Sequence, residues 1–123
     1  MSDFEGTLII ESLRTGTDVR DLSLTLRDIR RFRPGATGAG QPEIWTALTF
    51  TVVEEQALLV AHALSEVLEE RGWYVDLRSS KETLVVFPDK VFRYERGDAD
   101  GRARAQEHGS SLGIPEDQLD WPV

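Results

Sequence analysis

The segment Gly72–Tyr94 constrains the fold more than any other part of the chain. It contains the apolar run LVVF, at residues 84–87, between two segments rich in β-branched and aromatic residues. A strand of consecutive apolar residues is typical of a central strand that is covered on both faces. Pro88 follows this run and ends it, because proline cannot donate a ladder hydrogen bond. We therefore expect three short strands, over residues 73–79, 83–87 and 91–94.

The amino-terminal half of the chain shows the patterns of three further strands. Apolar residues cluster in the first segment, over residues 7–13, and alternate with polar ones from residue 22 and over residues 44–53. The alternation slips near Ile29. This slip indicates a β-bulge or a strand end, and a short helix over residues 26–32 is the alternative interpretation.

Two helices are predicted. Apolar residues at helical spacing predict a helix from Glu54 to Arg71, closed by Gly72 in a left-handed conformation. A second helix is expected from about Ala99 to Leu112, because Asp98 is a favoured N-cap and the apolar residues of the segment are small.

The order of these elements predicts an α+β fold. We expect a two-layer sandwich, with a mostly antiparallel sheet and two helices on one face, related to the ferredoxin-like split βαβ unit. Residues 1–123 would form one domain, with a flexible glycine-rich loop at 34–42 and a docking tail at 115–123. The sheet face opposite the helices would carry Trp45 and Tyr74, and a second copy of the chain is the commonest cover for such a face.

Composition and charge exclude several classes of function. The sequence has no cysteine, so disulfides and thiol chemistry are excluded, and with two histidines, His62 and His108, we predict no metal and no cofactor. The net charge of −8 argues against nucleic acid as the main partner. No apolar run reaches the length of a membrane span and no signal peptide is visible, so we expect a cytoplasmic protein without a membrane partner.

Four arginines form a basic cluster in this acidic chain. The planar guanidinium group suits bidentate contact with anions, which makes the cluster a candidate anion or phosphate site. The alternative is a solvated strand edge whose charges deter pairing with another sheet. Asp28 lies within the cluster and partly neutralises it. The four residues are Arg27, Arg30, Arg31 and Arg33.

A second candidate site lies in the central strands. Polar side chains beside the aromatic residues of these strands predict a shallow ligand cleft, although packing in the sheet core explains the same aromatic residues. His62 could act as a base near Glu66, or be a solvated surface residue. None of these residues has a sequence partner that fixes a role, so we predict no catalytic residue. The predicted cleft residues are Tyr74, Arg78, Arg93 and Trp45, with Asp76 nearby.

Three segments carry a resemblance to other proteins. WYVDLRSSKETLVVF, KVFRYERGD and GIPEDQLDW resemble segments of a group of small bacterial proteins without an assigned activity. The resemblance covers most of the second half of the chain. It implies no activity and no catalytic residues.

The sequence favours a non-catalytic binding or regulatory module that acts through protein–protein contact as a homodimer. This prediction depends on the lack of a catalytic constellation and on aromatic residues expected on an open sheet face. The alternative is a small enzyme or small-molecule-binding domain with a cleft over that face.

Overall fold

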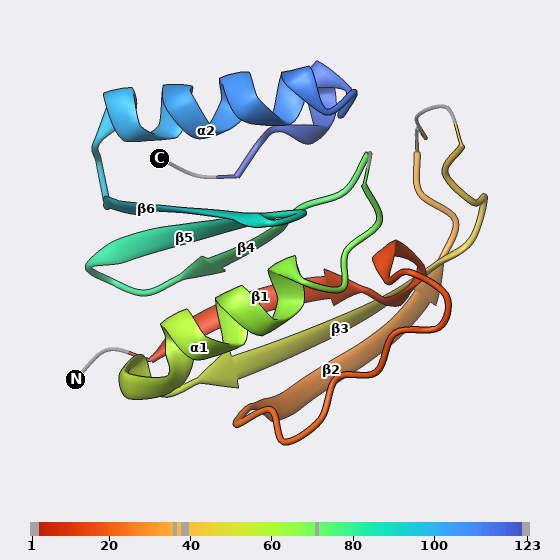
Figure 1. Cartoon of the computed structure of the whole chain (residues 1–123), viewed down its shortest axis with the longest axis horizontal. Coiled ribbons are helices and arrows are strands. Elements are labelled where there is room, and N and C mark those ends of the chain that lie inside the picture. The colour runs from red at the N-terminus through yellow and green to blue at the C-terminus, as the bar shows by residue number, and fades with distance from the viewer. Residues whose placement is uncertain (1–2, 36, 38–39, 71, 122–123) are drawn as a thin grey trace.

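The protein has an α+β fold, seen in a computed structural model that describes residues 3–35, 37, 40–70 and 72–121 (Figure 1). Within these residues, six antiparallel strands form one sheet in the order β2-β3-β1-β4-β5-β6. The predicted flexible loop at 34–42 includes residues 36, 38 and 39, which lie outside the described residues. The elements are β1 (Phe4–Ile9), a 3-10 turn η1 (Ile10–Ser12), β2 (Thr25–Phe32), β3 (Trp45–Val52), α1 (Glu54–Ser65), β4 (Val75–Arg78), β5 (Glu82–Phe87), β6 (Lys90–Glu95), α2 (Ala99–Ser111) and a 3-10 turn η2 (Glu116–Gln118).

Strand β5 is the centre of the core. Its residues Leu84 and Val86 pack against α1 in one buried cluster. Val85 and Phe87 point the other way and pack against α2 and the carboxyl-terminal segment in a second cluster. We call the side of the sheet with Leu84 and Val86 the first face, and the side with Val85 and Phe87 the second face. None of the four side chains is more than 1% exposed, which confirms that the LVVF run is covered on both faces.

The prediction of two helices on one face is wrong. Helix α1 contributes Ala57, Val60 and Leu64 to the cluster on the first face, whereas α2 contributes Ala105 to the cluster on the second. The physical reason is that side chains alternate along β5, so apolar residues in succession require a cover on each side. The ferredoxin-like relation is not confirmed either, because the strand order differs from that fold.

Helix α1 ends earlier than predicted, at Ser65 rather than Arg71. The chain beyond the helix pairs with the segment that follows η1, through an antiparallel bridge between Leu13 and Leu68. The backbone N–H of Arg14 donates to the carbonyl of Val67 at 2.8 Å. These tertiary hydrogen bonds replace the helical ones.

The amino-terminal strands also differ in extent from the prediction. Strand β1 ends at Ile9 and is followed by η1. Leu22 and Leu24 precede β2 and pack on the first cluster from a loop. The phase slip in β2 is a bulge between Leu26 and Asp28, so the bulge interpretation is confirmed and the helical alternative is wrong.

Helix α2 and the carboxyl-terminal segment cover β4–β6 on the second face. The predicted cap is present, because Asp98 Oδ1 accepts from the backbone N–H of Gly101 at 3.0 Å. Trp121 is 3% exposed, and its indole Nε1 donates to the hydroxyl of Tyr94 at 2.6 Å. Arg102 donates to the carbonyl of Trp121 at 2.8 and 3.0 Å. This part of the second face is therefore sealed by the chain itself, contrary to the open face expected from the sequence.

The close approach of α2 to β6 requires glycine at position 101. A Cβ atom there would lie 2.6 Å from Cβ of Tyr94. We expect Gly101→Ala to lower the free energy of unfolding by about 1–3 kcal/mol, because the backbone of α2 must move. Urea denaturation measures this loss.

Gly109→Ala is the matched control in the same helix. Its added Cβ would lie 2.7 Å from Cδ2 of Leu119, the far end of a flexible side chain, and 3.2 Å from Cε1 of Phe87, with no backbone atom among the nearest contacts. The loss at Gly109 should therefore be smaller than at Gly101. Equal stability of Gly101→Ala and the wild type would contradict this view of the packing.

Candidate binding surface

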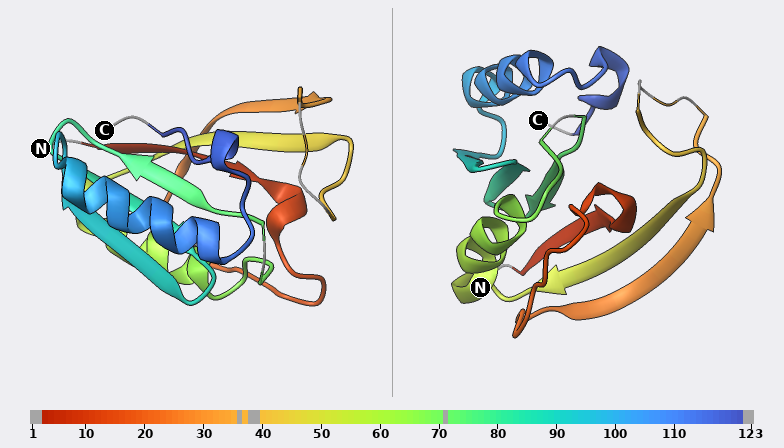
Figure 2. Two further views of the ribbon diagram at one scale, coloured as in Figure 1. Left: turned by 90° about the horizontal axis from the view of Figure 1, so that it is seen from above. Right: turned by 45° about the vertical axis from the view of Figure 1, so that its right-hand side comes forward.

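The β2–β3 hairpin extends away from both helices. Figure 2 shows β2 as the outermost strand of the curved sheet. Seven of the eight residues of β2 are exposed, and the last, Phe32, is half-buried. Two of the exposed side chains are large and apolar, Leu26 at 48% and Ile29 at 60%. The strand thus presents an outer edge without a neighbouring strand in the described sheet.

The arginines predicted as a basic cluster lie on this hairpin. Arg30 pairs in register with Ala47 and Arg31 with Thr46, so their side chains point to opposite faces of the sheet. Arg31 donates to Thr46 Oγ1 at 3.1 Å, and the guanidinium of Arg30 lies 4.2 Å from the ring centroid of Phe32. Basic groups therefore flank the open edge on both faces.

The other two arginines differ in their contacts. Arg33 forms an exposed ion pair with Glu43 at 3.2 Å, which occupies it within the hairpin. Arg27 lies at the bulge and is exposed, and no partner for it is found among the described residues. The four arginines thus line one strand edge and do not converge on a single anion-sized point.

Glu11 binds the hairpin near its loop end, at Thr46. Its two carboxylate oxygens accept from the backbone N–H of Thr46 at 2.6 Å and from Thr46 Oγ1 at 2.9 Å. Burial acts to raise the pKa of Glu11, but these hydrogen bonds and the charge of Arg31 outweigh it, so the pKa lies below its ordinary value. The sequence analysis did not identify this residue. An acid directly after the apolar run LII was the available signal.

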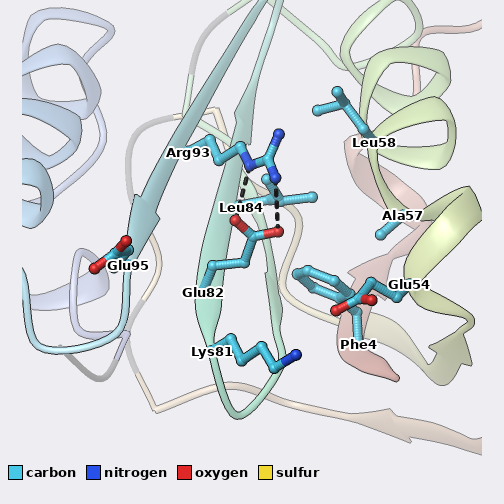
Figure 3. A pocket seen from close by; sticks show the side chains of 9 residues that line it. All are labelled: Phe4, Glu54, Ala57, Leu58, Lys81, Glu82, Leu84, Arg93 and Glu95. Atoms are coloured by element: carbon cyan, nitrogen blue, oxygen red, sulfur yellow. Dashed lines mark hydrogen bonds and ion pairs between the residues drawn. The ribbon is translucent and has the colours of Figure 1, made fainter. Parts of the chain in front are cut away.

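The structure does not bring the predicted cleft residues together. Tyr74 and Arg78 point to the second face, whereas Arg93 lies opposite Leu84 on the first face. Figure 3 shows Arg93 in a groove between β5, β6 and α1, where its Nε donates to Glu82 Oε2 at 2.8 Å. Acidic side chains line most of the polar wall of this groove.

Trp45 and Tyr74 do share a pocket, on the second face. This pocket has a volume of about 210 Å³ and lies between β1, β3, β4 and the carboxyl-terminal segment. Trp45 Nε1 donates to the carbonyl of Pro42 at 2.9 Å, and the Tyr74 hydroxyl donates to the carbonyl of Gln118. The full lining is Thr7, Ile9, Trp45, Gly72, Trp73, Tyr74, Asp76, Gln118 and Asp120.

Two carboxylates give this pocket its electrostatic character. Burial raises the pKa of Asp76, against the opposing charge of Arg78, and Asp120 raises it further. Burial and the charges of Asp76 and Asp120 also raise the pKa of Tyr74 above its usual range. The sequence predicted Asp76 beside the cleft, but not Asp120, which the carboxyl-terminal segment brings to the site.

The histidines lie apart from this pocket. His62 is exposed on α1. Burial and the charge of Lys90 lower the pKa of His108. The reason is that its ring packs 5.0 Å from Phe87 and 5.4 Å from Phe92, between centroids.

Two other features, a metal site and a membrane-spanning helix, are absent from the described residues. Among them, no group of three or more histidines and acids is arranged to hold a metal ion. In the same part of the chain, no helix has both the length and the apolar character to cross a membrane.

Comparisons with protein-family models, curated proteins and solved structures give no match. No residue role can therefore be carried over from a relative.

The contact of Glu11 with Thr46 predicts a pH-dependent stability. Because the folded-state pKa is depressed, the carboxylate stabilises the fold at pH values above the ordinary value of 4.5, and this contribution is lost as the pH falls through the folded pKa. We expect Glu11→Gln to lower the free energy of unfolding by about 1–2 kcal/mol at pH 7. Denaturant titrations at several pH values should show the difference shrinking on acidification.

Glu107→Gln makes the same change of charge at an exposed position of α2. It should leave stability nearly unchanged at each pH. A difference for Glu11→Gln that does not depend on pH would contradict the role of the carboxylate.

Proposed function

We propose that this chain is a non-catalytic protein-binding module that adds an extended, acidic segment of a partner protein to the outer edge of β2. The observation that carries the proposal is the exposed edge of β2, which presents unpaired backbone groups between arginines on both faces. In β-strand addition, backbone hydrogen bonds supply affinity and side chains on alternate positions supply specificity.

Exposed apolar residues support a strand partner. An edge strand with large exposed apolar side chains is a template for pairing with another strand, and proteins usually protect such edges with short strands, charged side chains or bulges. The arginines of β2 repel a basic or identical strand, but they attract an acidic one. β2 has a bulge near its start, but from Asp28 to Phe32 it pairs with β3 in regular register. Ile29 lies in this regular part and is the most exposed large apolar side chain of the strand.

The charge of the edge favours an acidic segment. Arg30 lies on the second face and Arg31 on the first, so a strand laid beside β2 would meet a guanidinium group on each side. Cross-strand pairs of opposite charge contribute about 0.2–1 kcal/mol each. Acids on both faces of the incoming strand would therefore complement this edge.

The same charge disfavours pairing of β2 with its own copy. The segment 27–33 contains four arginines and one aspartate, so two copies side by side would place like charges together. The homodimer expected from the sequence stays a prediction, and its rationale is weaker because α2 and Trp121 cover the face that was expected to require a partner.

A peptide-binding measurement tests the proposal. The probe is a fluorescein-labelled eight-residue peptide of valine, threonine and glutamate, with glutamates on both faces of the extended chain. We expect binding by fluorescence polarisation, and a loss of about tenfold in affinity for the double variant Arg30→Gln, Arg31→Gln, because two cross-strand pairs are removed. The double variant Arg20→Gln, Arg104→Gln changes the net charge equally, at exposed positions outside β2, and should bind as the wild type does.

Two altered peptides separate strand pairing from simple charge attraction. A peptide N-methylated at two consecutive central residues loses a donor on each of its edges and should not bind. A peptide with lysine in place of glutamate should not bind either. Equal binding of the N-methylated peptide would overturn the proposal, as would tight binding of a single-stranded oligonucleotide without binding of the acidic peptide.

A further inference from the structure

The pocket beside Trp45 is separate from the outer edge of β2 and has its own chemistry. It lies on the second face, where the carboxyl-terminal segment passes the ends of β1, β3 and β4. Its apolar wall comes from Ile9 and the rings of Trp45 and Trp73, whose centroids are 5.1 Å apart. The lining also includes two acidic residues, Asp76 and Asp120.

The polar groups of the pocket differ in whether a hydrogen bond or ion pair within the chain already occupies them. The hydroxyl of Tyr74 is used in its contact with Gln118. Asp76 forms an ion pair with Arg78 at 2.9 Å, and its side chain is only 20% exposed. Within the described part of the chain, the carboxylate of Asp120 has no hydrogen bond or ion pair. The formal charges that line the pocket are therefore both negative, and one of them is not neutralised locally.

Aromatic rings beside carboxylates favour one chemical class of ligand. A cation over the face of an indole ring gains about 0.5–1 kcal/mol at an exposed site and about 2 kcal/mol when it is desolvated. A carboxylate adds a charge-assisted hydrogen bond to an ammonium group. An anion would meet both carboxylates without a basic residue in the lining. The charge complement of this pocket is a cation.

The size of the pocket and the residues around it further limit the kind of cation that it could bind. Its volume of about 210 Å³ has room for a molecule of several non-hydrogen atoms. Since Arg78 offsets Asp76, a single positive charge is the complement of what remains. The apolar wall favours a cation with a hydrocarbon part over a hydrated inorganic ion.

We infer that the pocket between Trp45 and Asp120 binds a small organic ammonium ion, with its hydrocarbon part against Trp45 and Ile9 and its nitrogen at the carboxylates. This inference does not depend on strand addition at β2, because the two sites use different residues.

Hydrogen bonds hold the segments around the pocket in place. Gln41 and Gln118 exchange amide hydrogen bonds at 3.2 and 3.0 Å, and Gln41 also donates to the carbonyl of Gly72 at 2.8 Å. These contacts fix the carboxyl-terminal turn beside the loop that precedes β3. Asp120, a lining residue of the pocket, follows Gln118 by two positions on the segment that these contacts hold.

Three isosteric probes test the charge preference. Phenethylammonium, 2-phenylethanol and phenylacetate have a similar shape and differ in charge. Titration followed by tryptophan fluorescence and by amide chemical shifts of residues around the pocket should give the affinity order cation, then alcohol, then anion. Asp120→Asn should lower the affinity for phenethylammonium by about fivefold or more, because the cation loses a charged partner. The affinity for 2-phenylethanol, which has no charge, should stay unchanged.

Asp117→Asn is the matched control. It makes the same change on η2 at an exposed residue outside the lining, so phenethylammonium should bind it as it binds the wild type. The inference is overturned if the alcohol binds as tightly as the cation, if the two aspartate variants behave alike, or if no amide of the pocket shifts with phenethylammonium.

Discussion

Burial of β5 on both faces is the interaction on which the rest of the structure depends. Leu84, Val85, Val86 and Phe87 lose nearly all contact with water, and each such side chain contributes about 1.5–3 kcal/mol of hydrophobic free energy. Successive side chains of β5 point to opposite faces of the sheet. This one strand therefore contributes to both apolar clusters, one on each face. Helix α1 is needed for one cluster, and α2 with the carboxyl-terminal segment is needed for the other.

Local sequence patterns predicted the elements well because the interactions that form them are local. The alternation in β4, the apolar run in β5, the bulge in β2 and the cap at Asp98 all follow from residues within a few positions of one another. The layer arrangement was mispredicted although the LVVF run already required cover on both faces. The insertion of β1 between β3 and β4 depends on long-range pairing, which no local pattern encodes.

The candidate sites also divide into features that local sequence encodes and features that depend on long-range pairing. Arg30 and Arg31 were recognised as part of a basic cluster, with a strand edge as one of two interpretations, because the signal lies in one short segment. Arg93 was placed with Tyr74 and Arg78 because the register of the β5–β6 hairpin was unknown, and that register puts Arg93 opposite Leu84. The pocket at Trp45 combines residues from β1, β3, β4 and the carboxyl-terminal segment, so it becomes visible only when the chain is folded.

The reciprocal amide contact between Gln41 and Gln118 joins positions that are 77 residues apart in sequence. One partner precedes β3, the strand that supports β2, and the other lies on the turn that leads to Asp120. Any coupling carried by this contact must be reciprocal: if a ligand in the pocket changes the affinity of the β2 edge by some factor, a partner at the β2 edge changes the affinity of the pocket by the same factor. A pair of uncharged side chains would then act as the coupling element of the protein, insensitive to ionic strength and to pH.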